Sequence, residues 1–437
     1  DLSVQFPRTA PRADAFVHKS YARFLEDVPY IHKAEVQDFI RNGVHLRTPT
    51  PRPPLHEAAT GDEEVDFFTS VDILNGVAKG TILGGFDYKG QDNITVVAPD
   101  GRIVVIDMDG VKLFRAGKVK TLNPNGRGIT NFKENLLNDM YSKIEKSVFL
   151  PSLQDVTGVA KDVVYAFLAD FTSAYKQIAL SYYSWGSVTY LLLGKLFIEL
   201  AMTFGWAPAC KIFQHFSESF LFALAHHFPY LFQDKDGGPI KLPSPFTEVR
   251  GVLGLMTVFI DDYFVGAKGT REIAYQRSCS QRNWLQFWFY IFNMDARVDH
   301  SERVLVYLGR VLDLVEKTTY LPPAKLKRAL DRVNCFLTGR RFGFGLEQFG
   351  HRLFNGRDLA GLAGSLNYLA LLEKRLYPLI APVYRASDDV GLSELVRISF
   401  SSHKWLFYAL KQCNLIILEN RHIPLKEAAG VTVFRQK

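Results

Sequence analysis

Two adjacent aspartates interrupt an apolar run, which reads Val258-Phe259-Ile260-Asp261-Asp262-Tyr263-Phe264-Val265-Gly266. Apolar residues on both sides predict a strand, a two-residue turn and a second strand, with the two acids at the tip of the hairpin. Neighbouring carboxylates raise each other's proton affinity unless a cation compensates their charge. Hard oxygen ligands suit Mg²⁺ or Mn²⁺. The tip is therefore a candidate metal site, and a solvated Asp-Asp turn is the simpler alternative.

A third acid ends another predicted strand. Residues 163–169 form a buried-type apolar run, and Asp170 follows it directly. Thr172 or Ser173 then fits the N-cap of a helix that would continue through Tyr175. Two strand ends with three carboxylates could hold two metal ions about 4 Å apart, which is the arrangement that supports in-line nucleotidyl transfer. Such chemistry depends on positioning and charge neutralisation, so it requires no Cys or His ligand.

Five segments resemble motifs of reverse transcriptases, in the order and spacing of that family. They are the first palm motif at Asp170–Ile178, the template- and nucleotide-contacting motif at Phe204–Gln214, the aromatic-x-Asp-Asp motif at Phe259–Asp262, the primer-grip hairpin at Val306–Asp313 and the helical segment after the thumb at Leu359–Tyr368. The last segment is most similar to the enzymes of long-terminal-repeat and tyrosine-recombinase retroelements. No RNase H segment is recognised.

The resemblance implies an α+β polymerase right hand. Four parts are expected, namely an N-terminal extension with a proline-rich linker (1–64), fingers (65–154), a palm with an antiparallel sheet and helices (155–316), and a mostly helical thumb or connection (317–437). The implied activity is RNA-directed DNA polymerisation, with two Mg²⁺ or Mn²⁺ ions as cofactors. The implied partners are an RNA or DNA primer–template and deoxynucleoside triphosphates.

The resemblance also assigns roles within the palm. Asp170 and Asp261 would bind both metal ions, and Asp262 would assist them. Tyr175 matches the aromatic residue that excludes a ribose 2′-hydroxyl, although a core tyrosine is an equal alternative. Gln177 would lie near the nucleotide or template, or on a solvated helix face. Gly205 would let the backbone approach a base pair closely, and a simple helix-start glycine is its alternative.

Two groups of cations complete the expected site. Lys118 and Lys120 resemble the fingers element that contacts the triphosphate, with an exposed charged hairpin as the alternative. The thumb candidates recur at three- and four-residue spacing, so much of their charge can share one helix face suited to phosphates. These thumb candidates are Lys325, Lys327, Arg328 and Arg332. A solvated helix face explains the same pattern.

Several departures from the family pattern support a second hypothesis. Pro208 comes two residues early, Lys120 replaces the usual arginine, and Asn123 lies near the place of an aspartate. Arg297 lies near the position of a leaving-group lysine, but an arginine is a poor proton donor, and a surface salt bridge suits it better. The alternative is therefore a catalytically idle, domesticated subunit of an RNA–protein assembly, which would bring other subunits as partners.

Composition agrees with a polyanionic partner, because the 437 residues carry a net charge of +7. The four cysteines have no zinc or disulfide spacing, which favours a reducing, intracellular compartment. Lys195 and Glu199 interrupt the apolar run at 190–201, so no membrane contact is expected. The sequence begins at Asp1 rather than Met, which leaves a removed targeting peptide open.

Overall fold

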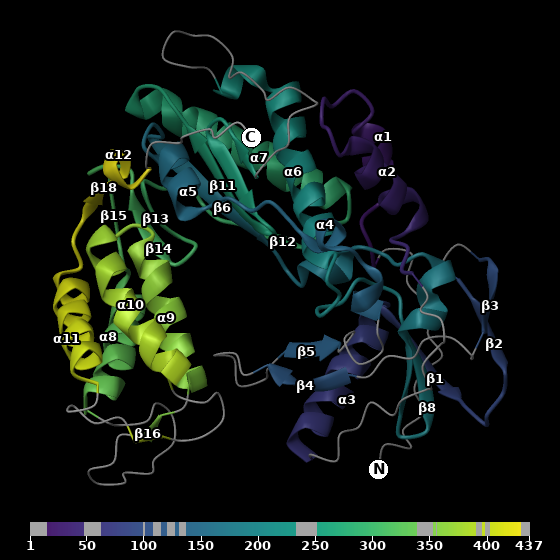
Figure 1. Ribbon diagram of the computed structural model, residues 1–437. Coiled ribbons are helices and arrows are strands. Elements are labelled where there is room, and N and C mark those ends of the chain that lie inside the picture. The colour runs from purple at the N-terminus through teal and green to yellow at the C-terminus, as the bar shows by residue number, and fades with distance from the viewer. Residues whose placement is uncertain are drawn as a thin grey trace. The chain divides into compact units, whose positions relative to one another are not determined.

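The computed structural model describes residues 15–47, 63–98, 101–107, 115–119, 127–130, 137–232, 251–338, 353–354, 356–389, 396–397 and 403–429. These residues form helices and sheets with antiparallel strand pairs, which confirms the predicted α+β class (Figure 1). The right-hand arrangement and its four parts stay predictions. Two compact units divide the chain, namely Asp1–Leu150 with Phe167–Val265 and Gln276–His300, and Pro151–Ala166 with Gly266–Tyr275 and Ser301–Lys437.

A five-stranded sheet in the order β12-β6-β11-β10-β9 carries the three candidate acids. Its strands are β6 (Tyr165–Phe171), β9 (Val252–Leu253), β10 (Met256–Phe259), β11 (Asp262–Ala267) and β12 (Ala296–Val298). The first two residues of β6 and the last two of β11 belong to the second unit. Near-continuous burial of β10 and β11 explains why their sequences are apolar rather than alternating.

The helices α6 (Ala209–His227) and α7 (Arg271–Ile291) lie beside this sheet (Figure 1). Aromatic side chains pack the sheet against both helices. Phe171 of β6 lies with its ring centroid 5.5 Å from that of Phe213 on α6 and 4.9 Å from that of Phe289 on α7. Both partners are buried. Burial of such large rings, at about 25 cal/mol per Å² of apolar surface, holds the acid-bearing strand end in place.

The N-terminal helices α1 (Ser20–Phe24) and α2 (Lys33–Asn42) pack beside α6. Tyr21 is fully buried and stacks on Phe220 of α6, with 4.4 Å between the ring centroids. The Tyr30 hydroxyl donates a hydrogen bond of 2.5 Å to the buried Glu218 carboxylate. Burial raises the pKa of Glu218, although this and other hydrogen bonds oppose the rise.

A three-stranded sheet, β1-β8-β7, and two hairpins complete the first unit. The elements are α3 (Glu63–Lys79), β1 (Ile82–Asp87), β2 (Asn93–Val97), β3 (Ile103–Asp107), β4 (Arg115–Val119), β5 (Arg127–Thr130), β7 (Thr189–Leu192) and β8 (Lys195–Glu199). The strands β2 and β3 pair as an antiparallel hairpin, with Asn93 opposite Asp107. Short helical turns are η1 (Leu137–Met140), α4 (Lys143–Lys146), η2 (Ala174–Gln177), η3 (Tyr182–Val188) and η4 (Pro229–Phe232).

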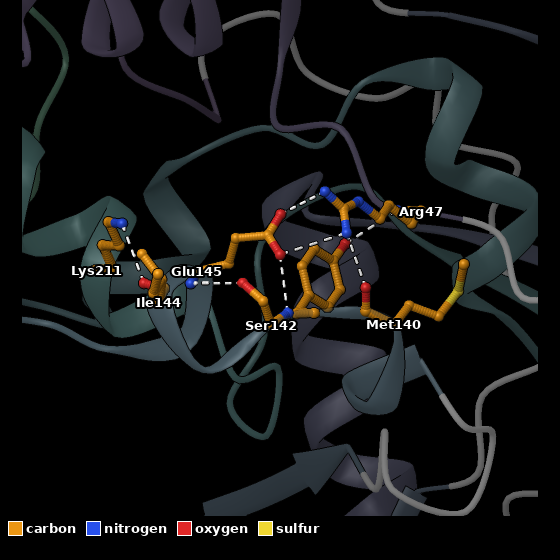
Figure 2. A network of polar contacts seen from close by, with 7 residues as sticks. Arg47, Met140, Ser142, Ile144, Glu145 and Lys211 are labelled. Atoms are coloured by element: carbon orange, nitrogen blue, oxygen red, sulfur yellow. Dashed lines mark hydrogen bonds and ion pairs between the residues drawn. The ribbon is translucent and has the colours of Figure 1, made fainter.

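Figure 2 shows a polar network that joins residue 47 to the η1–α4 segment. The Arg47 guanidinium donates to the Met140 carbonyl at 2.8 Å and pairs with Glu145. Ser142 and Glu145 form a capping box that starts α4. Lys211 of α6 reaches the Ile144 carbonyl at 3.4 Å. These contacts attach the η1–α4 segment to α6.

The second unit combines a four-stranded sheet, β13-β14-β15-β18, with a group of helices. Its elements are α5 (Leu153–Ala160), β13 (Val304–Tyr307), β14 (Arg310–Asp313), β15 (Thr318–Tyr320), α8 (Pro323–Thr338), β16 (Leu353–Phe354), α9 (Gly356–Ala370), η5 (Lys374–Leu376), α10 (Tyr377–Asp389), β17 (Val396–Arg397), α11 (Lys404–Glu419), β18 (Ile423–Pro424) and α12 (Leu425–Ala428). One core joins α8, α9, α10 and α11 through Val333, Leu362, Ile380 and Leu410. The predicted helices at 324–337 and 359–368 are confirmed as α8 and α9. None of the described helices is long and apolar enough to span a membrane.

Candidate active site

The hairpin that carries the paired aspartates differs by one residue from the prediction. Phe259 pairs with Asp262, so the two turn residues are Ile260 and Asp261, and Asp262 is the first residue of β11. Ile260 has a φ of 60°, which is costly for a β-branched residue. A positive φ at the first central residue alone is typical of a type II′ turn, where glycine is usual. The turn is therefore strained at the residue that precedes the two acids.

A buried amide on α6 holds this strained turn. The Gln214 Oε1 accepts a hydrogen bond of 2.6 Å from the Ile260 N–H, and its Nε2 donates to the Val258 carbonyl at 3.0 Å. The same nitrogen donates to Glu218 at 3.0 Å. Each such bond contributes about 1 kcal/mol, which can offset a backbone strain of about 1–3 kcal/mol. The sequence motif contained Gln214, but sequence reasoning assigned it no role.

Asp170 and Asp262 interact electrostatically at neighbouring strands of the sheet. Asp170 is the penultimate residue of β6, as predicted, and β6 lies beside β11. Burial, and then the negative charge of Asp170, raise the pKa of Asp262 to about 6. Arg297, which faces Asp170 across the β6–β12 pairing, partly opposes that rise. Two carboxylates in this environment favour a bound cation.

Asp261 belongs to the same neighbourhood, since its charge helps to raise the pKa of both Tyr175 and Tyr263, after the larger effect of burial. The three aspartates do not form one tight chelate. Within the part of the chain that the structure describes, a group of three donor atoms that all lie within 4.8 Å of one another occurs only at His32, Glu35 and His215.

Tyr175 lies in a buried aromatic setting beside the acids. Its hydroxyl is 3.0 Å from the Cys210 sulfur, and its ring centroid is 4.8 Å from that of Phe204. The expected longer helix through Tyr175 is wrong, because η2 is a single 3-10 turn. Ser173, at its N-cap, has a φ of 54° and makes no capping hydrogen bond with its side chain. The Tyr175 ring is nevertheless fixed by its neighbours.

Gln177 does not lie on a solvated helix face, so that alternative is wrong. Its side chain is buried, and its amide bonds to backbone groups on both sides. The Nε2 donates to the carbonyls of Thr172 and Asp295 at 2.8 Å and 2.7 Å, and Oε1 accepts from the Asp295 N–H at 2.9 Å. Gln177 therefore joins the end of β6 to the start of β12 as a structural residue.

Gly205 occupies a backbone conformation that suits glycine, with a φ of 101°. Asn138 of η1 holds the backbone around it, because Nδ2 donates to the Gly205 carbonyl at 2.8 Å and Oδ1 accepts from the Ala207 N–H at 2.8 Å. Trp206 is buried, and its ring packs edge-on against that of Tyr141. Sequence reasoning missed Asn138, since nothing local links residues 138 and 205.

Of the cations expected near the acids, the structure describes the side chain of Arg297 but not those of Lys118 and Lys120. Lys118 is in β4, but its side chain lies outside the described part of the structure. Lys120 and Asn123 lie outside the described residues altogether. Arg297 pairs with Asp299, with 3.1 Å between Nε and Oδ1, which confirms the expected surface salt bridge.

The thumb candidates all lie on α8 in the second unit. Lys325, Lys327 and Arg332 are exposed, and Arg328 is half-buried. The Arg332 guanidinium donates to the Ser365 hydroxyl of α9. The spacing of residues 325, 328 and 332 places them on one face of the helix, whereas residue 327 lies on another.

No protein-family model and no curated protein matches the sequence. In structure the chain is similar to the foamy viral protease-reverse transcriptase in complex with double-stranded DNA, with a TM-score of 0.50 and 11% identity over 90% of this chain and 71% of that one. The dRH form in complex with double-stranded DNA gives a TM-score of 0.49 and 10% identity over 94% of this chain and 62% of that one. This chain thus spans less than two thirds of the dRH form. Together with the first of these matches, the strand order and the hairpin show that the chain has a reverse transcriptase-like fold.

Proposed function

We propose that the chain is an RNA-directed DNA polymerase that transfers nucleotides to a primer 3′-hydroxyl. The observation that carries this proposal is the placement of Asp170 and Asp262 on the neighbouring strands β6 and β11, beside Asp261 on a strained turn that Gln214 holds. Partly buried like charges lower the stability of a fold unless a bound cation compensates them. Perturbed carboxyl groups and local strain both concentrate at functional sites. A scaffold that only contacted RNA would not need clustered acids.

The donor set fits Mg²⁺ or Mn²⁺, because all three side chains offer carboxylate oxygens. Asp170 and Asp261 would hold two such ions, and Asp262 would complete their surroundings. When bound, these ions neutralise charge on the triphosphate and make the primer hydroxyl more acidic. The Gln214 clamp keeps the turn carboxylate in one position, which is the main contribution that a protein makes to phosphoryl chemistry.

The remaining residues would select and position the substrate. The Tyr175 ring, wedged between Phe204 and Phe213, would exclude a ribose 2′-hydroxyl and so favour deoxynucleoside triphosphates. Gly205, held by Asn138, would support the base pair. Lys118 and Lys120 are proposed to contact the triphosphate.

The proposed partner is an RNA or DNA primer–template. The net charge of +7 and the exposed cations of α8 favour a polyanion. The foamy viral protein with the same fold was solved with double-stranded DNA, which supports a nucleic-acid ligand here.

The test is extension of a DNA primer on poly(rA) with Mg²⁺ or Mn²⁺. We expect extension by the wild-type chain and its loss in Asp261→Asn. Asp295→Asn is the matched control, since the Asp295 carboxylate is exposed at the nearby strand β12 and should leave extension unchanged. No extension by the wild-type chain under any metal, primer or partner condition would instead favour the idle subunit of an RNA–protein assembly.

A further inference from the structure

Two histidines and a glutamate meet between α2 and α6, apart from the three aspartates. His32 is at the N-cap of α2, Glu35 lies in its first turn, and His215 lies on α6. The Glu35 Oε2 is 2.6 Å from Nδ1 of His215 and 3.9 Å from Nδ1 of His32. All three donor atoms lie within 4.8 Å of one another. Two imidazoles and one carboxylate are a common ligand set for zinc.

The distances suit a transition-metal ion after a small rearrangement. Zinc bonds of about 2.0–2.2 Å place neighbouring ligand atoms of a tetrahedron about 3.3 Å apart. The two measured distances, 2.6 Å and 3.9 Å, lie on either side of this value. A metal ion would replace the proton between Glu35 and His215, so that this pair moves apart while His32 moves closer.

One of the two imidazole rings has to rotate before both can bind the same metal ion. The two imidazoles stack with 3.7 Å between their centroids and 6° between their planes, so their in-plane lone pairs cannot meet at one ion. The His32 side chain is 26% exposed at the helix end, whereas the His215 side chain is only 9% exposed, so His32 is the ring that we expect to turn. The Glu35 side chain is 43% exposed, which gives an ion a path from solvent.

We propose that His32, Glu35 and His215 form a binding site for Zn²⁺, with its fourth position open to water, which links α2 to α6. The site is distinct in chemistry from the three aspartates, whose oxygen-only donors favour Mg²⁺. The adjacent Gln214 holds the turn of the β10–β11 hairpin, so an occupied site would anchor the helix that carries this clamp. The proposal is independent of polymerase activity.

The test is direct metal binding by the full chain, with Zn²⁺ in calorimetry and Co²⁺ as a spectroscopic probe of tetrahedral coordination. We expect one tight equivalent in the wild-type chain and in Asp261→Asn. In His32→Ala and Glu35→Gln the affinity should fall by at least about 100-fold, because even losing a partner outside the coordination sphere costs about 10–100-fold. His45→Ala is the matched control, since His45 is an exposed histidine in the same region.

Folding of each variant is checked by circular dichroism and by its melting temperature without metal. Both test residues are at least partly exposed, so a folded variant is expected for each. Added Zn²⁺ should raise the melting temperature of the wild-type chain and of His45→Ala, but not of His32→Ala. The proposal is overturned if no stoichiometric binding occurs, or if binding is lost in Asp261→Asn while His32→Ala and Glu35→Gln retain it.

Discussion

The Gln214 amide accepts a hydrogen bond of 2.6 Å from the Ile260 N–H, so a side chain on α6 fixes the backbone of the turn before the paired acids. Gln214 is fully buried, and both ends of its amide are used. A helix packed on the sheet thereby holds the backbone on either side of Phe259, directly before the two acids.

Replacing Gln214 by alanine should lower both stability and activity. The variant leaves the Ile260 N–H and the Glu218 carboxylate without this partner, which should cost about 2–3 kcal/mol of unfolding free energy. Primer extension should fall at least about tenfold, because misplaced catalytic groups lose orientation. Urea unfolding and extension assays measure the two effects. Gln154→Ala, which removes a half-buried amide in the second unit, is the control, and equal effects of the two variants would contradict the clamp.

The Ile260→Gly variant should be more stable than the Ile260→Ala variant, although glycine is usually the more destabilising of the two residues. The φ of 60° strains any residue with a Cβ, by about 1–2 kcal/mol. We therefore expect Ile260→Gly to exceed Ile260→Ala by about 1 kcal/mol in unfolding free energy. Paired chemical denaturation measures the difference. A more stable alanine variant would mean that the turn is not held at a positive φ.

Asp262 should make the metal-free protein less stable as the pH rises. Its pKa is raised to about 6 in the folded chain, so the folded state binds this proton more tightly than the unfolded state does. The stabilisation that this tighter proton binding gives to the folded state is fully present below the unfolded pKa of about 3.9. It is lost as the pH rises through about 6. After discounting for partial exposure it amounts to about 1 kcal/mol.

The measurement compares wild type with Asp262→Asn in EDTA at about pH 4 and about pH 8. The wild-type chain should lose stability relative to the variant between these two values. Added Mg²⁺ should restore part of the loss at the higher pH, because it binds the ionised carboxylate. A stability difference that does not change with pH would show that the Asp262 pKa is not raised.

Tyr175 should control the choice of sugar. Tyr175→Val opens space at the proposed 2′ position, so the preference for deoxynucleotides over ribonucleotides should fall by at least about tenfold. Tyr175→Phe keeps the ring and loses only the contact with the Cys210 sulfur, so it should retain the preference. Single-nucleotide incorporation rates with dTTP and UTP give the ratio. Equal ratios in the valine and phenylalanine variants would place the ring away from the sugar.

The sequence correctly predicted those helices and strands that are specified by the local pattern of apolar and polar residues. The apolar runs around residues 163–170 and 258–265 are strands, and the basic stretch at 324–337 is a helix, because periodicity and flanking residues specify these elements. The turn was misplaced by one residue, since the left-handed Ile260 is stabilised by Gln214, 46 residues away in the chain.

The contacts of Gln177 and the cluster of His32, Glu35 and His215 arise only from long-range contacts. Gln177 was expected near a nucleotide or on a solvated helix face, and the structure shows a buried amide that bonds to Asp295, 118 residues away. The cluster of His32, Glu35 and His215 was also invisible, because 180 residues separate Glu35 from His215. No local pattern encodes such pairs, so they emerge only when the helices pack.

The central claim is tested most directly by incorporation of one deoxynucleotide opposite a matched RNA template base, with a DNA primer and Mg²⁺. The wild-type chain and Asp295→Asn should add the nucleotide at similar rates, while Asp170→Asn and Asp261→Asn should each lose at least about 100-fold. Incorporation that persists unchanged in both aspartate variants, or that is absent from the folded wild-type chain with Mg²⁺ and with Mn²⁺, would contradict a polymerase centre at these residues.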